Sequence, residues 1–227
     1  MLKRFKHFWE STFDNHADYW LNKKSVPDKL QTAITPYINK ELKVLDLGCG
    51  GGRLAAALVP GFQKVYGIDG SEQLLNKAAK ENPETNLVCG NFQSAAVWKS
   101  LNTQFDVIVS NCAVRKDYCG NLPQVASLCH EHLNPNGALI MRIQAFEDLK
   151  PILPEELRKS IFYSSEEIQQ IFSQFNVQVE HENYVQKFSS ENYVRTFLER
   201  INIQYDGPIR LLNIPRHYYI VKATKRN

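Results

Sequence analysis

One short stretch constrains the fold more than any other part of the chain: Lys43-Val-Leu-Asp-Leu-Gly-Cys-Gly-Gly-Gly-Arg53. Its first half is apolar and predicts a buried strand, which Asp46 interrupts with a carboxylate. Glycines recur at Gly48, Gly50 and Gly52, and the small and apolar residues that follow predict a helix. Because glycine adopts positive φ angles and lets another molecule approach the main chain, this strand–glycine–helix passage favours a bound ligand.

Details of the glycine loop distinguish two classes of cofactor. A dinucleotide-binding loop reads Gly-x-Gly-x-x-Gly/Ala, and its last small residue lets the helix pack closely beneath a pyrophosphate. Counted from Gly48, that position is Arg53, which is neither small nor apolar. Asp46 stands two residues before the first glycine, where a carboxylate repels a pyrophosphate and attracts an ammonium group. The spacing favours a cationic ligand without a pyrophosphate; a glycine-rich turn that binds nothing is the alternative.

With these residues, Asp46-x-Gly-x-Gly-x-Gly52 resembles motif I of the class I S-adenosylmethionine (SAM) methyltransferases. The resemblance implies SAM as the cofactor, with its methionine end held by motif I. It also implies a Rossmann-like α/β fold: a doubly wound, mostly parallel seven-stranded sheet with an antiparallel strand beside strand five. The motif I positions in this chain are Asp46, Gly48, Cys49, Gly50 and Gly52.

The pattern of the rest of the chain agrees with a doubly wound sheet, because strands and helices alternate from residue 43 to residue 185. An amphipathic helix is predicted over residues 5–23, and a second one, capped by Ser25, precedes the first strand. We therefore expect residues 1–40 to form a helical extension or lid, and residues 41–227 to form the SAM-binding domain with an inserted helix near 189–202. Residues 146–162 are expected to be an irregular rim segment.

Asp69 ends the second predicted strand, 17 residues after Gly52. Open α/β sheets bind ligands at the carboxyl ends of their strands, and a carboxylate there can accept hydrogen bonds from both ribose hydroxyls. A turn residue or helix cap is the alternative, although Ser71 is the better cap. Asp69 matches the acidic residue of the family's motif II, so Asp69 and the adjoining Gly70 are predicted to bind the cofactor.

Two further loops complete the predicted cofactor site. Asn91 stands where the family usually has an aspartate that accepts a bond from the adenine amino group, and its amide oxygen remains an acceptor. The resemblance also implies that the main-chain N–H of Phe92 reaches the adenine ring. Asn111 and Cys112 begin the loop that matches motif IV, which lies beside the sulfonium in the family.

The motif IV loop bears on the methyl acceptor. It lacks the two prolines and the aromatic residue that amino-group methyltransferases of DNA and protein carry, which disfavours a nucleobase or glutamine amide as acceptor. Arg115 and Lys116 are expected either to receive an anionic acceptor or to be solvated loop charges. Arg142, within an apolar strand, needs a partner: a carboxylate-bearing substrate or, more commonly, a neighbouring Asp or Glu.

No motif identifies a catalytic residue. A methyl group on a sulfonium is already activated, so the protein chiefly aligns donor and acceptor and excludes water. A general base is needed only if the acceptor must lose a proton. His16, Tyr19 and Arg115 are catalytic candidates by residue type only, and packing is the alternative role for each.

Composition excludes several classes of protein. A net charge of +3, without a basic block, does not indicate nucleic acid. The five cysteines contain no Cys-x-x-Cys pair and fit neither a disulfide framework nor a zinc site, so no metal is expected. No apolar run approaches the roughly 20 residues that span a bilayer, and no signal-peptide core follows the basic start. We expect a cytoplasmic protein that does not bind membranes.

These observations predict SAM-dependent methyl transfer to an oxygen, nitrogen or carbon centre of a small molecule. Three alternatives stay open: a non-catalytic SAM-binding subunit of a complex, an NAD-dependent oxidoreductase and an RNA methyltransferase. Arg53 and Asp46 count against the oxidoreductase, and the RNA enzyme would need a basic face. The sequence indicates neither the acceptor nor the oligomeric state.

Overall fold

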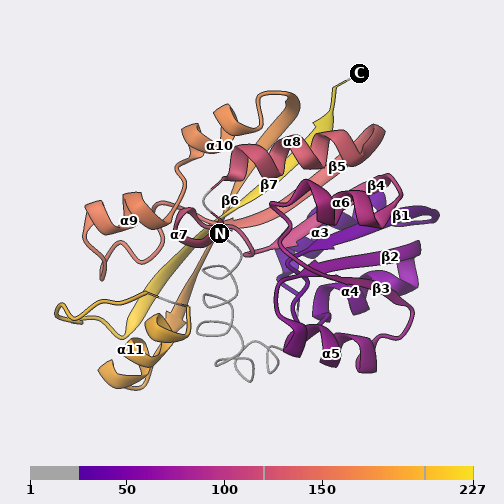
Figure 1. The fold of residues 1–227 in the computed structure, drawn as a ribbon. Helices are drawn as coiled ribbons and strands as arrows, with labels where there is room; N and C mark the ends of the chain where they lie inside the picture. Colours follow the sequence, from indigo (N-terminus) through magenta and orange to yellow (C-terminus); the bar gives the residue numbers. More distant parts are fainter. Residues whose placement is uncertain (1–25, 120, 202, 227) are drawn as a thin grey trace.

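A computed structural model describes residues 26–119, 121–201 and 203–226. Within these residues one seven-stranded sheet has the order β3-β2-β1-β4-β5-β7-β6 (Figure 1). The first five strands pair in parallel, and β7 is antiparallel to both β5 and β6. The predicted mostly parallel sheet and the antiparallel strand beside strand five are confirmed. The strands are β1 (Asn39–Leu47), β2 (Phe62–Asp69), β3 (Thr85–Cys89), β4 (Phe105–Asn111), β5 (Leu133–Gln144), β6 (Phe175–Lys187) and β7 (Asn213–Lys225).

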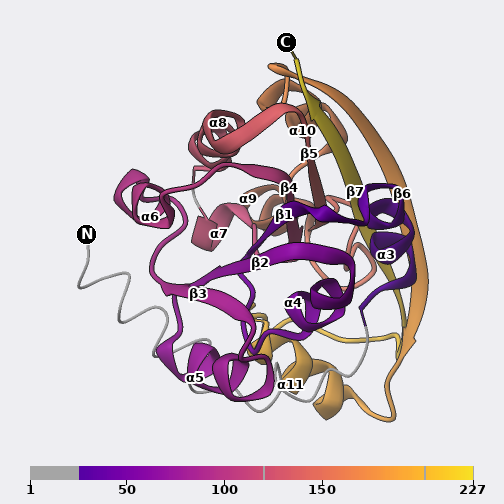
Figure 2. The ribbon, with the colours of Figure 1, turned by 90° about the vertical axis from the view of Figure 1, so that its right-hand side faces the viewer.

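Helices cover both faces of the sheet (Figure 2). Successive residues of β1 point to opposite faces: Val44 packs with α3 and α4, whereas Leu45 and Leu47 belong to the core that includes α6, α8 and α10. The helices are α3 (Asp28–Ile34), α4 (Arg53–Leu58), α5 (Glu72–Glu81), α6 (Ala95–Leu101), α7 (Lys116–Cys119), α8 (Leu122–His132), α9 (Glu155–Ile161), α10 (Ser165–Ile171) and α11 (Glu191–Arg200), with short 3-10 turns at Thr35–Tyr37 and Val59–Gly61.

A third apolar core lies beside the sheet, where β6 and β7 extend beyond β5. The first residues of β7, Asn213 to His217, pair with β6 alone. Side chains from α9, α11 and the start of β7 pack together there, among them Phe162, Phe197 and Ile214. Phe197 and Ile201 of this small core also line the cavity described below.

The structure differs from the sequence-based expectations in several helices. Helix α6 was not predicted, because its seven residues bury only Trp98 and Leu101 and show too little periodicity. Helix α9 lies inside the segment expected to be irregular; Pro154 stands at its start, where proline is tolerated. The capping box Ser164-x-x-Glu167 predicts a helix that runs through Phe175, but α10 ends at Ile171 and Phe175 already begins β6.

The predicted helix over 5–23 lies outside the described residues, as do Ser25, the predicted cap of the second helix, and the candidates His16 and Tyr19. Within the described ranges, no helix is both long and apolar enough to cross a membrane. No group of three or more His, Cys, Asp or Glu side chains in these ranges is arranged to hold a metal ion.

Candidate functional site

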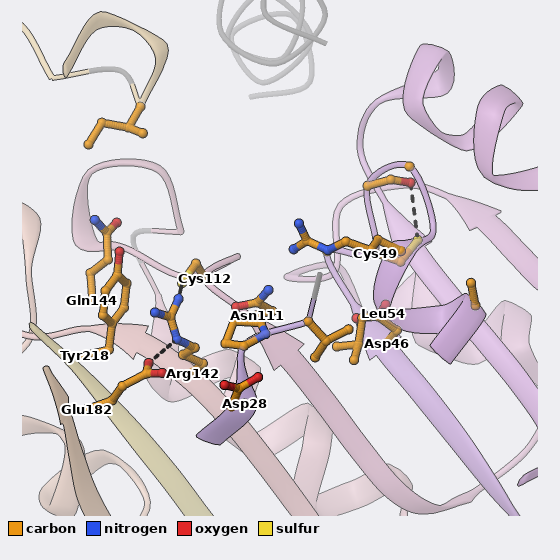
Figure 3. A pocket seen from close by; sticks show the side chains of 18 of the residues that line it. Asp28, Asp46, Cys49, Leu54, Asn111, Cys112, Arg142, Gln144, Glu182 and Tyr218 are labelled. Atoms are coloured by element: carbon orange, nitrogen blue, oxygen red, sulfur yellow. Dashed lines mark hydrogen bonds and ion pairs between the residues drawn. The ribbon is translucent and has the colours of Figure 1, made fainter. Parts of the chain in front are cut away.

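A cavity of about 1120 Å³ opens where β1, β4 and β5 end at the carboxyl edge of the sheet (Figure 3). One side is formed by the glycine loop and the start of α4, and the other, called the β6–β7 wall, by β6, β7 and α11 together with Arg115 and the end of β5. Figure 3 shows Asp46 and Cys49 on the first side, Arg142, Glu182 and Tyr218 on the second, and Asn111 between them. The cavity therefore lies between the predicted cofactor loop and a second wall for which the sequence contains no motif.

Backbone geometry explains the glycines of the loop. Gly48, Gly50 and Gly52 have φ angles of 68°, 52° and 79°, which side chains rarely adopt. A Cβ on Gly48 would stand 2.2 Å from the Cβ of Ala113 in the motif IV loop, and one on Gly52 would stand 2.9 Å from the Cβ of Ala78. Glycine is thus required at Gly48 both by its φ angle and by the close approach of the two loops.

Asp46 is a buried carboxylate whose hydrogen-bonding capacity is unused at one oxygen. Its side chain is 1% exposed, and Oδ2 has no hydrogen-bond partner among the described residues. Burial, followed by the charge of Asp69, raises the pKa of Asp46 to about 7, although the Ala55 amide and Arg53 act in the opposite direction. An unsatisfied buried carboxylate is costly, which indicates that a donor-bearing ligand belongs here.

Asn111 presents a second unsatisfied acceptor on the neighbouring strand. Leu47 of β1 pairs in register with Ser110 of β4, so Asn111 follows directly beyond the paired positions. Its Oδ1 atom is buried and has no partner in the described part of the chain. Asp46 and Asn111 both line the cavity, so two acceptor atoms from adjacent strands are available to one ligand.

The other predicted cofactor residues outside the glycine loop lie at the end of β2 or just after β2 and β3, and they are not part of the cavity lining. Both oxygens of Asp69 accept main-chain hydrogen bonds, Oδ2 from Gly50 at 2.8 Å and Oδ1 from Ser71 at 2.9 Å. Asp69 therefore also shapes the glycine loop. Asn91 accepts a bond from the Gln93 amide, and Phe92 is buried in the core. The structure brings Asp46, Gly48, Cys49, Gly50, Asn111, Cys112 and Arg115 into the cavity wall, but not Gly52, Asp69, Gly70, Asn91 or Phe92.

Arg142 has the neighbouring acid that the sequence analysis preferred as its partner. Its Nε donates to Glu182 Oε2 at 2.5 Å, and Nη1 donates to the Cys112 sulfur at 3.1 Å. The guanidinium carbon stands 3.4 Å from the centre of the Tyr218 ring, a cation–π contact. Sequence reasoning missed both Glu182 and Tyr218, because their proximity to Arg142 depends on how β6, β7 and β5 align.

Arg216, which also lines this wall, forms an ion pair with Asp148 in which the polar side-chain atoms of both residues are hydrogen-bonded. Arg216 donates from Nε and Nη2 to the two oxygens of Asp148, each at 2.8 Å, and from Nη1 to Gln186 at 2.7 Å. Asp148 is 0% exposed and also accepts from Gln144 and from the His217 amide. This bidentate geometry compensates two charges that would otherwise be costly to bury.

The remaining candidates from the sequence have other partners. Arg115 lines the cavity, but its side chain pairs with Asp117 and donates to the Ile201 carbonyl. Lys116 pairs with Glu167, outside the cavity wall. The structure thus keeps Arg115 near the site as a structural contact between the motif IV loop and the end of α11.

Comparison with known proteins agrees with the fold and the loop. The methyltransferase-domain family matches residues 38–199. The malonyl-[acyl-carrier protein] O-methyltransferase of Priestia megaterium is 24% identical over 213 residues, covering 90% of this chain and 74% of that protein. The trans-aconitate 2-methyltransferase of Deinococcus radiodurans is 33% identical over 109 residues, covering 47% of this chain and 39% of that protein. The crystal structure of a SAM-dependent methyltransferase from Archaeoglobus fulgidus has the same fold, with a TM-score of 0.59 and 21% identity over 87% of this chain and 91% of that one.

The sheet order and the glycine loop define a class I SAM-dependent methyltransferase. The chain belongs to the methyltransferase-domain family, and SAM is its cofactor. The residues present fit this cofactor: Asp46 and Asn111 offer unpaired acceptors suited to an ammonium group, and Gly48 lines the same cavity without a side chain that would fill it.

Proposed function

We propose that this chain transfers a methyl group from SAM to an oxygen, nitrogen or carbon centre of a small molecule bound between the glycine loop and the β6–β7 wall. The observation that carries the proposal is the pair of buried, unpartnered acceptor atoms, Asp46 Oδ2 and Asn111 Oδ1, which line one cavity. An ammonium group supplies the donors that both atoms lack. The acceptors in the names of two curated relatives, trans-aconitate and a malonyl group on a carrier protein, support a small acceptor group.

In this proposal the residues divide into cofactor and acceptor contacts. Asp46 and the loop from Gly48 to Gly52 hold the methionine end, Asp69 holds the ribose, and Asn91 with Phe92 holds the adenine. Asn111 and Cys112 border the place where cofactor and acceptor meet.

When bound, SAM supplies a methyl group activated by its sulfonium. The chain contributes alignment and the exclusion of water, which are the main requirements of an in-line displacement. The wall near Arg142 suits this purpose: Arg142, Gln144 and Tyr218 are all buried, so an acceptor placed there loses much of its hydration.

Isothermal titration calorimetry tests the proposal. We expect saturable SAM binding, no binding of NADH, and about tenfold weaker SAM binding to Asp46→Asn, because a charge-assisted hydrogen bond is lost. Asp206→Asn, at an exposed position, is the matched control and leaves the affinity unchanged. Binding of NADH without SAM would overturn the proposal.

A non-catalytic SAM-binding subunit is distinguished by turnover. Incubation with methyl-labelled SAM and fractionated cell metabolites should yield a labelled small molecule if the chain is an enzyme. Tight SAM binding with no labelled product in any fraction would favour the subunit. We propose the cytoplasm as the location, since the number and spacing of the five cysteines do not indicate a disulfide framework.

A further inference from the structure

The wall opposite the glycine loop presents more cationic than anionic side chains to the cavity. Arg115, Arg142 and Arg216 line this wall, and Glu182 is the carboxylate among its lining residues. Asp117 and Asp148, which pair with Arg115 and Arg216, are not part of the lining. Each of the three guanidinium groups is thus paired with one carboxylate, and what distinguishes them is how many of their N–H donors remain available to a ligand.

Among these three arginines, Arg142 retains donor capacity. All three nitrogens of Arg216 donate to other residues, and those of Arg115 do so as well. Arg142 uses Nε for Glu182 and Nη1 for Cys112, while Nη2 has no hydrogen-bond partner among the described residues. Because a thiol is a weak acceptor, a carboxylate oxygen can also take over the Nη1 contact.

Two neighbouring side chains fix the orientation of the Arg142 guanidinium. Glu182 fixes the Nε edge, and the Tyr218 ring lies against the guanidinium face, which leaves the Nη1–Nη2 edge toward the cavity. This edge lies beside the motif IV loop, because Arg142 pairs in register with Asn111 and its carbonyl accepts from the Cys112 amide. A group bound there is therefore adjacent to the proposed methionine end of SAM.

We propose that the methyl acceptor is a small carboxylic acid and that the Nη1–Nη2 edge of Arg142 binds its carboxylate. The inference rests on the proposed function, which it narrows to one substrate class. A planar guanidinium matches a carboxylate with two parallel hydrogen bonds, a geometry that a lysine at this position would not provide.

Direct binding of three small probes tests the proposal without turnover. Benzoate, its neutral isostere benzamide and the cation benzylammonium are compared by saturation-transfer NMR on the full chain loaded with S-adenosylhomocysteine. We expect benzoate to bind at least about tenfold more tightly than benzamide, because its hydrogen bonds to the guanidinium are charge-assisted on both sides. Equal binding of benzoate and benzamide, or a preference for benzylammonium, overturns the proposal.

Two neighbouring substitutions are expected to act in opposite directions. Arg142→Gln weakens benzoate binding about tenfold or more, whereas Glu182→Gln strengthens it, since a nearby negative charge is removed. If Arg142→Gln alone does not fold, the double variant Arg142→Gln/Glu182→Gln removes both charges together and should show the same loss. Unchanged benzoate affinity in the Arg142 variants contradicts the proposal.

SAM also carries a carboxylate, at its methionine end, that Arg142 can bind. Titration with SAM distinguishes this case from binding of a carboxylate on the acceptor. We expect Arg142→Gln to bind SAM within about twofold of the unmodified chain. A tenfold loss of SAM affinity with unchanged benzoate binding would assign Arg142 to the cofactor and overturn the inference. Failure of the unmodified chain to bind SAM would instead refute the proposed function, while the benzoate–benzamide comparison on the chain alone still tests Arg142.

Discussion

The two sides of the cavity are built on opposite principles. On the glycine-loop side, polar atoms are left unsatisfied: Asp46 Oδ2, Asn111 Oδ1 and the buried Nε of Arg53 have no partner among the described residues. On the β6–β7 side, the charged groups are paired, with Arg142 bound to Glu182 and Arg216 bound to Asp148. The first side is incomplete without a ligand, whereas the second is largely complete by itself.

This difference predicts which substitutions weaken SAM binding and which lower the free energy of unfolding. Removing an unsatisfied polar group costs the folded chain little but removes a ligand contact. Removing one member of a buried pair leaves the other charge without compensation and destabilises the folded chain. Substitutions on the glycine-loop side should therefore weaken SAM binding, and those on the β6–β7 side should lower the free energy of unfolding.

The largest effect is expected for Asp148→Ala. It leaves the Arg216 guanidinium buried beside no carboxylate, so the free energy of unfolding should fall by about 3–5 kcal/mol in urea titrations. The double variant Asp148→Leu/Arg216→Met removes both charges and should recover most of this loss. SAM affinity of the folded fraction should not change; a parallel loss of SAM affinity would break the division between the two sides.

The next largest effect is expected for Gly48→Ala. The new Cβ would collide with Ala113 at a φ angle of 68°, so we expect a loss of about 2–4 kcal/mol, divided between SAM affinity and stability. Gly50→Ala is the matched control, because its φ angle is similar but the nearest atom is 3.8 Å away. Ala113→Gly should partly rescue Gly48→Ala; equal effects at the two glycines would show that the close approach is unimportant.

The next largest effect is a pH dependence of the free energy of unfolding, which we expect from Asp46 on the glycine-loop side. Burial raises the pKa of Asp46 from 3.8 to about 7, so between these values the folded chain binds more protons than the unfolded chain. The free energy of unfolding without ligand should therefore fall as the pH rises from 4 to 7 and level off above 7.

SAM binding should show the opposite trend, because the ammonium group pairs with the ionised carboxylate. We expect the affinity to rise by about tenfold between pH 6 and pH 8, measured by calorimetry in buffers of different ionisation enthalpy. Asp46→Asn should lose both trends. A flat SAM affinity in the unmodified chain would show that Asp46 does not meet a cation.

The same contrast explains what the sequence could predict. The glycine loop consists of consecutive residues, so its conformation and the cofactor can be predicted from the sequence. The sheet can be predicted because strands and helices alternate along the chain. Glu182 and Arg142 are 40 residues apart, and Asp148 and Arg216 are 68 apart. These pairs form because β5, β7 and β6 align in one register, and no local pattern encodes that register.

The smallest expected effect lies at helix α11, which covers the β6–β7 side. Ser190 caps this helix by accepting from the Tyr193 amide at 3.4 Å, and Ser190→Ala should lower the free energy of unfolding by about 1 kcal/mol. Because Phe197 and Ile201 of this region line the cavity, fraying of α11 should raise the KM for the acceptor and leave SAM affinity unchanged. Ser190→Asp, which restores a cap, should return both values; a shift in SAM affinity instead would show that the two sides are coupled through α11.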